Sequence, residues 1–530
     1  DRLQYLRNLD QRRSEVSAAI QAQGKLTEEL SAALAAAATL AEVEDLYRPY
    51  KQKRRTRATV AREKGLEPLT RRLSAKGSAQ LDPEQEAAAF VDPEKGVDTA
   101  RDALQGAGDI LAEEISDRAD LRKQLRELAQ RRGVLVSKAA QAEPEDTVYR
   151  LYYDFRCPVS RLHGHQILAM DRGEREGKLT VTVLEDRERL LPMVCRAVVI
   201  PGSPAMDFVK DAAEDSLDRL IWPSLGREIR NHLTEQADEG AIGQFALNLK
   251  PLLMQPPVKG KVTMGLDPGY RMGCKVAVVD GTGKVLDTAV VYPTYGERQK
   301  KEAIAALEKL IRKHGVENIA IGNGTASRET EQMAVELIRQ VNEAGAHVSY
   351  MIVSEAGASV YSASKLAAEE FPQYDVNLRS AVSIARRLQD PLAELVKIDP
   401  KAIGVGQYQH DMPQARLGEA LDGVVEDCVN AVGVDANTAS PSLLVRVSGL
   451  TNTTAKNLVA YREENGAFTS RRQLLKVPKL GPKAFEQCAG FLRVPESRNV
   501  LDHTGVHPES YGAAEALLAL CGYSLDDVKA

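Results

Sequence analysis

Val447-Ser-Gly-Leu-Thr451 and Val477-Pro-Lys-Leu-Gly481 are two short stretches that follow the same pattern thirty residues apart. In each, two apolar residues flank a tight turn, and a small or apolar residue four positions further on opens a helix. The pattern is typical of a helix-hairpin-helix unit, in which a glycine-containing hairpin joins two short helices. A hairpin glycine lets the backbone approach a phosphate, and the first N–H groups of the following helix point at it. Each copy departs once from a full Gly-x-Gly hairpin, through Thr451 in the first and Lys479 in the second.

The chain around these hairpins is basic. Residues 441–494 hold nine Lys or Arg and three Asp or Glu, a local charge of +6, whereas the whole chain carries −5. A basic island in an acidic protein is expected of a domain that reads the phosphate backbone. We therefore predict a tandem helix-hairpin-helix pair that binds nucleic acid without direct base readout; the alternative is a pair of hairpins that serves only packing. The predicted contacts are Ser448, Gly449, Leu450, Thr451, Lys456, Lys476, Lys479, Gly481 and Lys483.

A second basic segment lies far from the hairpins in the sequence. Residues 48–64 hold eight Lys or Arg and a single acid, Glu63. Two interpretations stay open for this segment, a solvated basic face of a helical region and a further contact with phosphates. For the second interpretation, the residues that we expect to bind nucleic acid are Lys53, Arg54 and Arg55.

Composition excludes several classes of protein. Apolar residues make up 43% and charged residues 27% of the 530 residues, as in ordinary globular chains, and no run of eighteen apolar residues is present. The six cysteines show no CxxC spacing, which argues against a disulfide framework and against a zinc site. We expect a cytoplasmic protein with no membrane association. Because the chain begins at Asp1 inside a helical pattern, we also expect a piece of a longer protein.

The middle of the chain predicts an α/β domain. Val262–Asp267, Cys274–Val279 and Val285–Tyr292 read as three successive strands, with a hairpin turn at Asp280-Gly-Thr-Gly283. A helix over Glu297–His314 comes next, and two further strands follow at Glu317–Ile321 and Val348–Val353. A hairpin meander followed by alternating helices and strands is the order of an RNase H-like sheet.

A nuclease site in such a sheet needs three or four carboxylates around two metal ions. Asp267 ends the first strand and Glu355 follows the last one, so both stand where an acid is needed. Asn323 and Arg379 occupy two other positions, and Arg387 is a second arginine on the same predicted helix. We therefore expect no catalytic residues, no bound metal and no cofactor, with Asp267 and Glu355 as the remnants of a site. Three other acids could complete the site if the fold brought them close: Asp375, Glu426 and Asp427.

Two polar stretches follow strands of this domain, at 323–329 and 354–364. The carboxyl ends of strands are where α/β sheets form ligand crevices. The stretches can equally be turns and helix caps, with Thr325 or Ser327 capping the helix that begins near Glu329. The sequence does not decide between these two interpretations.

The fold class that we predict is a multidomain, mainly helical, elongated scaffold with one RNase H-like α/β domain. Its expected parts are 1–145, helical, with the basic segment 48–64; 146–258, mixed and then helical; 259–392, RNase H-like; 393–440, a helical connector; 441–495, the tandem helix-hairpin-helix; and 496–530, the incomplete start of a further helical module.

Several longer strings resemble one family, the Tex family of bacterial transcription accessory proteins. The strings are Leu46-Tyr-Arg-Pro-Tyr-Lys-Gln-Lys-Arg-Arg55, Gly265-Leu-Asp-Pro-Gly269, residues 320–330, 353–364, 383–392 and 404–411, and Val424-Val-Glu-Asp-Cys-Val-Asn-Ala-Val-Gly433. The resemblance covers nearly the whole chain. It implies that the α/β domain is of the YqgF type, which is RuvC-like, and that the partners are RNA or DNA and RNA polymerase or the transcription complex.

Family members end in an OB-fold RNA-binding domain that has no counterpart here, so the resemblance implies a chain truncated at both ends. Together, the residues and the resemblance predict a monomeric accessory protein that binds nucleic acid on a scaffold derived from a nuclease. Two alternatives remain from the residues themselves. One is a metal-dependent nuclease that uses Asp267 and Glu355, and the other is a protein-interaction scaffold whose hairpins dock helices.

Overall fold

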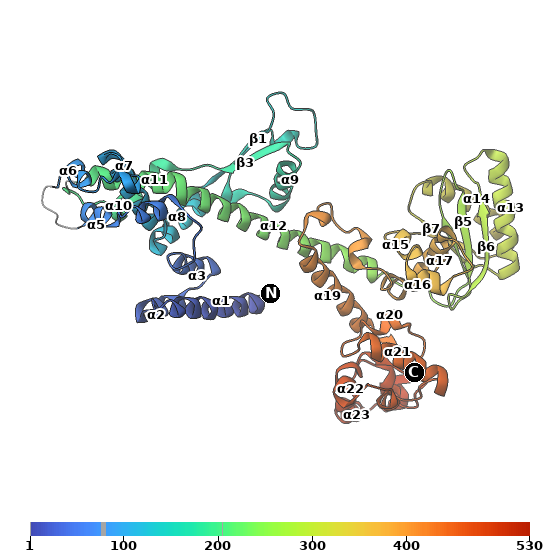
Figure 1. Cartoon of the computed structure of the whole chain (residues 1–530). Coiled ribbons are helices and arrows are strands. Elements are labelled where there is room, and N and C mark those ends of the chain that lie inside the picture. Colours follow the sequence, from blue (N-terminus) through green and yellow to red (C-terminus); the bar gives the residue numbers. More distant parts are fainter. Residues whose placement is uncertain (1, 76–80, 204, 530) are drawn as a thin grey trace. The chain divides into compact units, whose positions relative to one another are not determined.

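The computed structural model describes residues 2–75, 81–203 and 205–529 (Figure 1). The chain divides into two compact units, residues 1–239 and 240–530. Within the described ranges, no helix combines the length and the apolar character needed to cross a membrane. The chain is mainly helical with one five-stranded mixed sheet, which confirms the predicted fold class in those terms.

Four helices of the first unit begin at threonine caps. The side chains of Thr27, Thr39, Thr56 and Thr99 each accept a hydrogen bond from a backbone N–H in the first turn of the following helix. The helices of this unit are α1 (Arg2–Ala22), α2 (Glu28–Ala36), α3 (Leu40–Tyr47), α4 (Arg57–Glu63), α5 (Glu67–Ser74), α6 (Pro83–Ala88), α7 (Ala100–Ser116), α8 (Ala119–Arg132), α9 (Gly164–Arg175), α10 (Arg187–Val198), α11 (Met206–Asp215) and α12 (Trp222–Leu253), the last of which contains the division between the units.

A three-stranded antiparallel sheet interrupts these helices. β1 (Val134–Ala139) lies between β2 (Asp154–Pro158) and β3 (Leu179–Val183). Strand β3 alternates buried and exposed residues, so one of its faces packs against the unit. The prediction that residues 1–145 are helical throughout is wrong at β1. Helix α8 ends at Gly133, where a Cβ would lie 2.3 Å from the carbonyl oxygen of Ala129, and the apolar residues that follow extend into the sheet.

The second unit contains the five-stranded sheet, in the order β6-β5-β4-β7-β8. β4 (Thr263–Asp267) pairs antiparallel with β5 (Cys274–Val279) and parallel with β7 (Asn318–Gly322). β6 (Val285–Val291) and β8 (Ser349–Val353) are the outer strands. All five strands and the helix at 297–314 lie where the sequence predicts them.

Helices cover both faces of this sheet. Alternate residues of β4, β5 and β7 pack against α13 (Glu297–His314) and α14 (Ser327–Glu343) on one face. On the other face, Ala277 and Ala320 pack against α17 (Val376–Gln389) (Figure 1). Gly265 lets α17 approach β4 closely, since a Cβ there would lie 2.2 Å from the carbonyl oxygen of Ala381.

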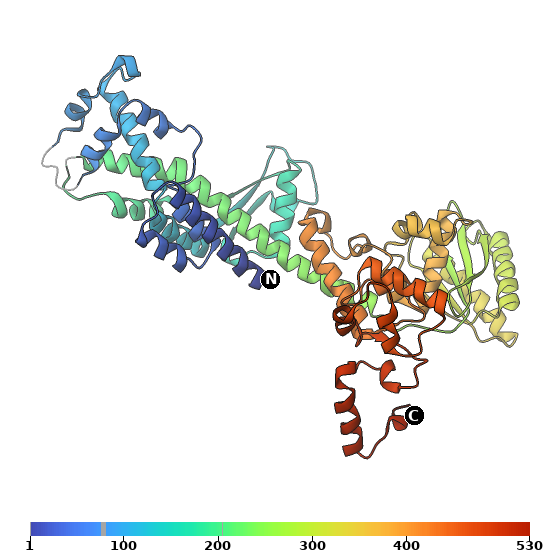
Figure 2. The same ribbon diagram turned by 60° about the horizontal axis from the view of Figure 1, so that its bottom comes forward.

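The second unit contains further helices, most of them short. They are α15 (Ala358–Ser362), α16 (Lys365–Glu370), α18 (Pro391–Leu395), α19 (Gln414–Val432), α20 (Pro441–Leu444), α21 (Asn452–Asn465), α22 (Pro482–Cys488), α23 (Tyr511–Leu520) and α24 (Leu525–Lys529). A two-stranded parallel ladder joins β9 (Val434–Asp435), directly after α19, to β10 (Leu492–Arg493), directly after the second hairpin. Figure 2 shows α23, in dark red, standing off from the orange and red hairpin helices, and every residue of α23 is at least partly exposed.

Candidate nucleic-acid interface and carboxylate pair

The two predicted hairpins have the same backbone turn. Gly449 has φ +86° and Lys479 has φ +65°, so both residues at this position are left-handed. The N–H of the next residue, Leu450 or Leu480, donates to the carbonyl oxygen of Val447 or Val477 at 3.1 Å in each turn. A left-handed conformation costs a residue other than glycine about 1–2 kcal/mol. The second hairpin therefore carries a lysine where the backbone favours glycine.

The helices that follow the two turns begin differently. Thr451 caps α21 in a reciprocal pair with Thr454, whose N–H donates to the Thr451 hydroxyl at 3.3 Å. Helix α22 begins with Pro482 after Gly481 and has no side-chain cap. The first-turn N–H groups of a helix have no acceptor within the helix. The second hairpin thus presents its first-turn donors without a competing side chain.

Each hairpin turn packs against the helix that follows the other hairpin turn. A Cβ at Gly449 would lie 2.6 Å from the Cβ of Gln487, so α22 presses directly on the first turn. In return, the side-chain amide of Asn457 on α21 donates to the carbonyl oxygen of Pro478 in the second turn at 2.9 Å. Leu450, Leu458 and Leu480 are buried in this arrangement. The two hairpins therefore form one body.

This packing uses some of the predicted phosphate donors. The backbone N–H of Ser448 donates to the side-chain oxygen of Asn430 on α19 at 3.1 Å. The N–H of Thr451 donates to the Thr454 hydroxyl at 2.7 Å, and that of Leu450 is held inside the turn. We therefore correct the expectation for the N–H groups of Ser448, Leu450 and Thr451, which have internal acceptors because the first turn is tied to its neighbours.

The predicted lysines lie on the surface of the hairpin body. Lys456, Lys476, Lys479 and Lys483 are exposed, as is Gly481. Within the described ranges, none of the four lysines forms an ion pair with an acidic side chain. Their charge is therefore available to a ligand. These residues, with Gly449, remain the predicted contacts.

The basic segment in the first unit has acidic neighbours of its own. Lys53 forms ion pairs with Asp117 and with Glu113 (3.5 Å), and Arg55 pairs with Glu63 at 3.0 Å. Arg54 is exposed. Acids at the end of α7 thus neutralise part of the charge that the sequence shows as unopposed. The basic segment therefore has less free charge than the sequence indicates. It stays a prediction that this segment binds phosphate through Lys53, Arg54 and Arg55.

The α/β domain brings Asp267 and Glu355 together. Asp267 ends β4, and Glu355 follows β8 on the same edge of the sheet. A Cβ at Gly322 or at Gly324 would lie 2.1 Å from a carboxylate oxygen of Glu355, so the two glycines leave the space that this side chain occupies. Burial, then the charge of Glu355 and a hydrogen bond between the two carboxyl groups, raise the pKa of Asp267 to about 7. Below about pH 7 the pair therefore holds a proton on Asp267.

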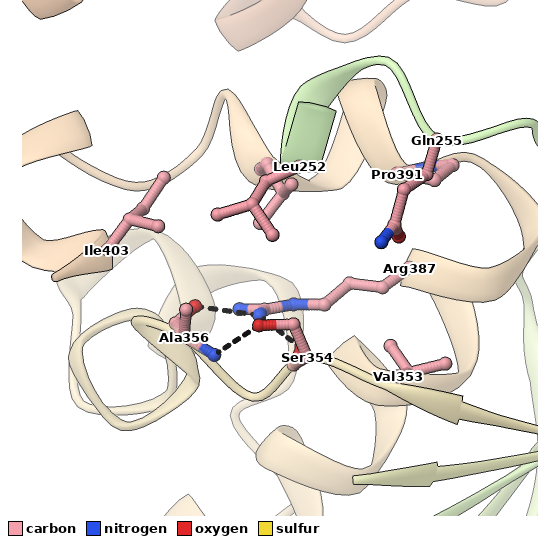
Figure 3. Close-up of a pocket in the computed structure, with 9 residues that line it drawn as sticks. Leu252, Gln255, Val353, Ser354, Ala356, Arg387, Pro391 and Ile403 are labelled. Carbon is pink, nitrogen blue, oxygen red and sulfur yellow. Dashed lines mark hydrogen bonds between the residues drawn. The ribbon is translucent and has the colours of Figure 1, made fainter. Parts of the chain in front are cut away.

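Arg387, not Arg379, is the arginine that acts on this pair. The Arg387 guanidinium is buried and donates to the carbonyl oxygens of Ser354 (2.9 Å) and Ala356 (2.7 Å), which flank Glu355 (Figure 3). Burial raises the pKa of Glu355, and the N–H of Gly324 and the charge of Arg387 oppose this shift. Arg379 donates instead to the carbonyl oxygens of residues 362 and 371. The expectation that Arg379 replaces a carboxylate of the cluster is therefore wrong, because its side chain supports the loop before α17.

The residues around the pair do not fit a two-metal site. Within the described ranges, no three His, Cys, Asp or Glu side chains are grouped to hold a metal ion. Asn323 uses its side-chain oxygen to accept the N–H of Glu355 at 2.9 Å, and Asp375 caps α17 by accepting the N–H of residue 378 at 2.8 Å. Glu426 and Asp427 are exposed on α19. A two-metal site needs more carboxylates than the two that meet here.

The loops after β7 and β8 enter their helices without side-chain caps. Ala326, with φ +65°, precedes α14, and Gly357, with φ +69°, precedes α15. The interpretation that Thr325 or Ser327 caps α14 is therefore wrong, since a left-handed residue takes that position. Whether these loops form a ligand crevice stays a prediction.

Family models match four stretches of the chain. A Tex central region-like model covers residues 78–245, and a Tex protein YqgF-like domain covers residues 261–389. A helix-hairpin-helix motif covers residues 429–493, and an HHH domain covers residues 499–530. The last match lies within residues 496–530, where the sequence predicts the start of a further helical module.

Relatives of similar sequence extend over nearly the whole chain. The chain is 48% identical to the uncharacterized protein YdcI of Bacillus subtilis over 533 residues, which are 100% of this chain and 73% of that protein. It is 49% identical to the transcriptional accessory protein Tex of Neisseria gonorrhoeae over 531 residues, 98% of this chain and 69% of that protein. The human S1 RNA-binding domain-containing protein 1 is 39% identical over 575 residues, 96% of this chain and 57% of that protein. With this identity and coverage, and with the hairpins and the α/β domain in place, the chain belongs to the Tex family.

Proposed function

We propose that this protein is a transcription accessory factor that binds the phosphate backbone of nucleic acid without sequence preference, through its helix-hairpin-helix body. The observation that carries the proposal is the hairpin body itself. It combines two turns of the same conformation with exposed lysines that have no acidic partner within the described ranges. Contacts of this kind give affinity that depends on salt and is indifferent to sequence.

The α/β domain acts in this proposal as a scaffold without hydrolytic activity. Its two carboxyl groups share a proton, and the positive charge near Glu355 comes from the guanidinium of Arg387. The side chain of Asn323 is used to position the Glu355 backbone. These features support a structural role for the pair.

The transcription part of the proposal comes from the relatives. One of them is named a transcriptional accessory protein and another an S1 RNA-binding domain-containing protein. We infer that the partners are RNA or DNA and the transcription complex, that the protein acts in the cytoplasm, and that it does so as a monomer.

A charge reversal in the second hairpin tests the proposal. We expect the double variant K479E/K483E to bind every oligonucleotide more weakly, by about tenfold or more at low salt, with similar losses for different sequences. The control is R298E/K365E, which makes the same change of charge at side chains that are 92% and 91% exposed on the α/β domain. Unchanged affinity in K479E/K483E would remove the hairpins as the binding surface and favour a scaffold that docks proteins.

The carboxylate pair supports one alternative function, a metal-dependent nuclease. The observation in its favour is the meeting of Asp267 and Glu355 at the carboxyl edge of the sheet, where one of the groups has a pKa of about 7. Cleavage that needs Mg²⁺ or Mn²⁺ and is lost in D267N would establish it. We expect no cleavage in either protein.

A further inference from the structure

A groove lies beside the second hairpin, between that hairpin and the chain that leads into α23. Its volume is about 880 Å³, and we call it the C-terminal groove. The residues that matter for its chemistry are Arg472, Leu475, Phe485, Arg498, Asn499 and Tyr511. None of them is among the predicted hairpin contacts.

A buried polar network forms the floor of the groove. Arg471 is only 1% exposed, and its guanidinium donates to the carbonyl oxygen of Leu492 at 2.9 Å and to the Tyr511 hydroxyl at 2.8 Å. Asp502 accepts hydrogen bonds from the N–H of Arg471 (3.2 Å), the Tyr511 hydroxyl (2.5 Å) and the Ser497 hydroxyl (2.6 Å). The network ties residues 497–511 to the hairpin body, so the two walls of the groove are held in a defined position.

The rim of the groove is positively charged. Arg472 and Arg498 are both exposed, and within the described ranges neither forms an ion pair. Among the described residues, the lining contains a single carboxylate, that of Asp502, whose oxygens accept hydrogen bonds from the floor network. Guanidinium groups bind phosphate through two parallel hydrogen bonds and suit this ligand better than ammonium groups do.

The wall between the arginines is partly apolar. Leu475 is 41% exposed, although it is a large aliphatic residue, and Phe485 is partly buried beside it. An aromatic ring next to cationic side chains is the combination on which unpaired bases stack in single-strand binding proteins. A duplex cannot use such a surface, because its bases are already stacked and paired.

We propose that the C-terminal groove binds single-stranded nucleic acid, with its phosphates on Arg472 and Arg498 and an unpaired base against Phe485 and Leu475. The proposal rests on the proposed function and deepens it. The hairpin lysines hold any phosphate backbone, whereas the groove adds affinity for strands with accessible bases.

The test compares single strands and duplexes by fluorescence anisotropy, with labelled oligonucleotides of about twelve nucleotides or base pairs. We expect R472E/R498E to lose about tenfold or more in affinity for single strands and less than about threefold for duplexes. We expect K479E/K483E to weaken both probes alike, and R298E/K365E to serve as the control for net charge. F485A keeps every charge, and we expect it to weaken single strands selectively. Circular dichroism and melting of each variant confirm that it folds.

The outcomes separate the two proposals. If K479E/K483E weakens both probes while R472E/R498E behaves like the control, the groove proposal is wrong and the proposed function stands. If the unaltered chain binds no probe at low salt, both are wrong. Polyglutamate could also displace the labelled single strand as effectively as unlabelled oligonucleotide does. That result would overturn the groove proposal and would indicate an acidic polypeptide as the ligand.

Discussion

Replacing Asp267 by asparagine should remove a pH-dependent weakness of the α/β domain. The folded protein raises the pKa of Asp267 from its ordinary value of 3.8 to about 7, so the folded state holds the proton more tightly than the unfolded chain does. The proton on Asp267 therefore stabilises the folded domain relative to the unfolded chain. This stabilisation is complete below about pH 4 and is lost as the pH rises to about 7. The amide of asparagine keeps the shape of the carboxyl group and donates to Glu355 at every pH.

The size of the effect follows from the shift. Each pH unit between the two pKa values changes the free energy of unfolding by about 1.36 kcal/mol. From pH 5 to pH 7 the wild-type domain should therefore lose about 2.3 kcal/mol that D267N does not lose, because the slope falls to half as the pH reaches the folded pKa. Burial of Glu355 raises the pKa of that side chain as well, in both proteins. The difference between the two proteins is therefore the quantity to measure.

Native-state hydrogen exchange of amides in β4 and β7 reports on this domain alone, after correction for the intrinsic pH dependence of exchange. The expected loss corresponds to a fall of about fiftyfold in wild-type protection between pH 5 and pH 7, relative to D267N. Equal pH dependence in the two proteins would refute the shared proton and with it the account of the pair as a neutralised remnant.

Three further substitutions test other parts of the account. G324A places a Cβ 2.1 Å from a Glu355 oxygen; it should push the two carboxyl groups apart and flatten the same pH dependence, and a pH dependence identical to that of the wild type would show that the glycine is not needed. K479G should raise the free energy of unfolding of the hairpin body by about 1 kcal/mol by relieving the left-handed lysine, as measured by urea denaturation, whereas a loss of stability would mean that the lysine stem packs favourably. R471L leaves the carbonyl oxygens of Leu492 and Leu501 without their donor and should lower the free energy of unfolding by about 3 kcal/mol or more. Limited proteolysis should then cut residues 499–529 first. Resistance equal to that of the wild type would contradict the anchoring role of Arg471.

The elements of the α/β domain follow from local sequence because its strands are mainly apolar runs bounded by turns. Asp280-Gly-Thr-Gly283 predicts the turn between β5 and β6, and the carboxyl group of Asp280 does accept the N–H of Thr282 at 2.9 Å. The two hairpins are equally local, since five residues define each turn. The fold was predictable to this extent without any tertiary information.

The candidate site depends on contacts that the sequence does not contain. Arg379 and Arg387 lie two helical turns apart on α17, and only the packing of α17 decides which of them supports Glu355. The free charge of Lys53 depends on acids some sixty residues away, at the end of α7. Lys479 departs from the hairpin pattern in residue type, yet it takes the same left-handed conformation as Gly449. A backbone angle of this kind leaves no trace in the residue type.

The measurement that tests the central claim most directly is a salt series of binding. Single- and double-stranded DNA and RNA are titrated with the protein by fluorescence anisotropy in the presence of Mg²⁺, and each sample is then run on a denaturing gel. We predict affinity that falls steeply with salt, similar affinities for unrelated sequences, and intact probes. Cleaved probes would contradict the claim that the α/β domain is a scaffold, and binding that does not change with salt would contradict the claim that the hairpins hold phosphates.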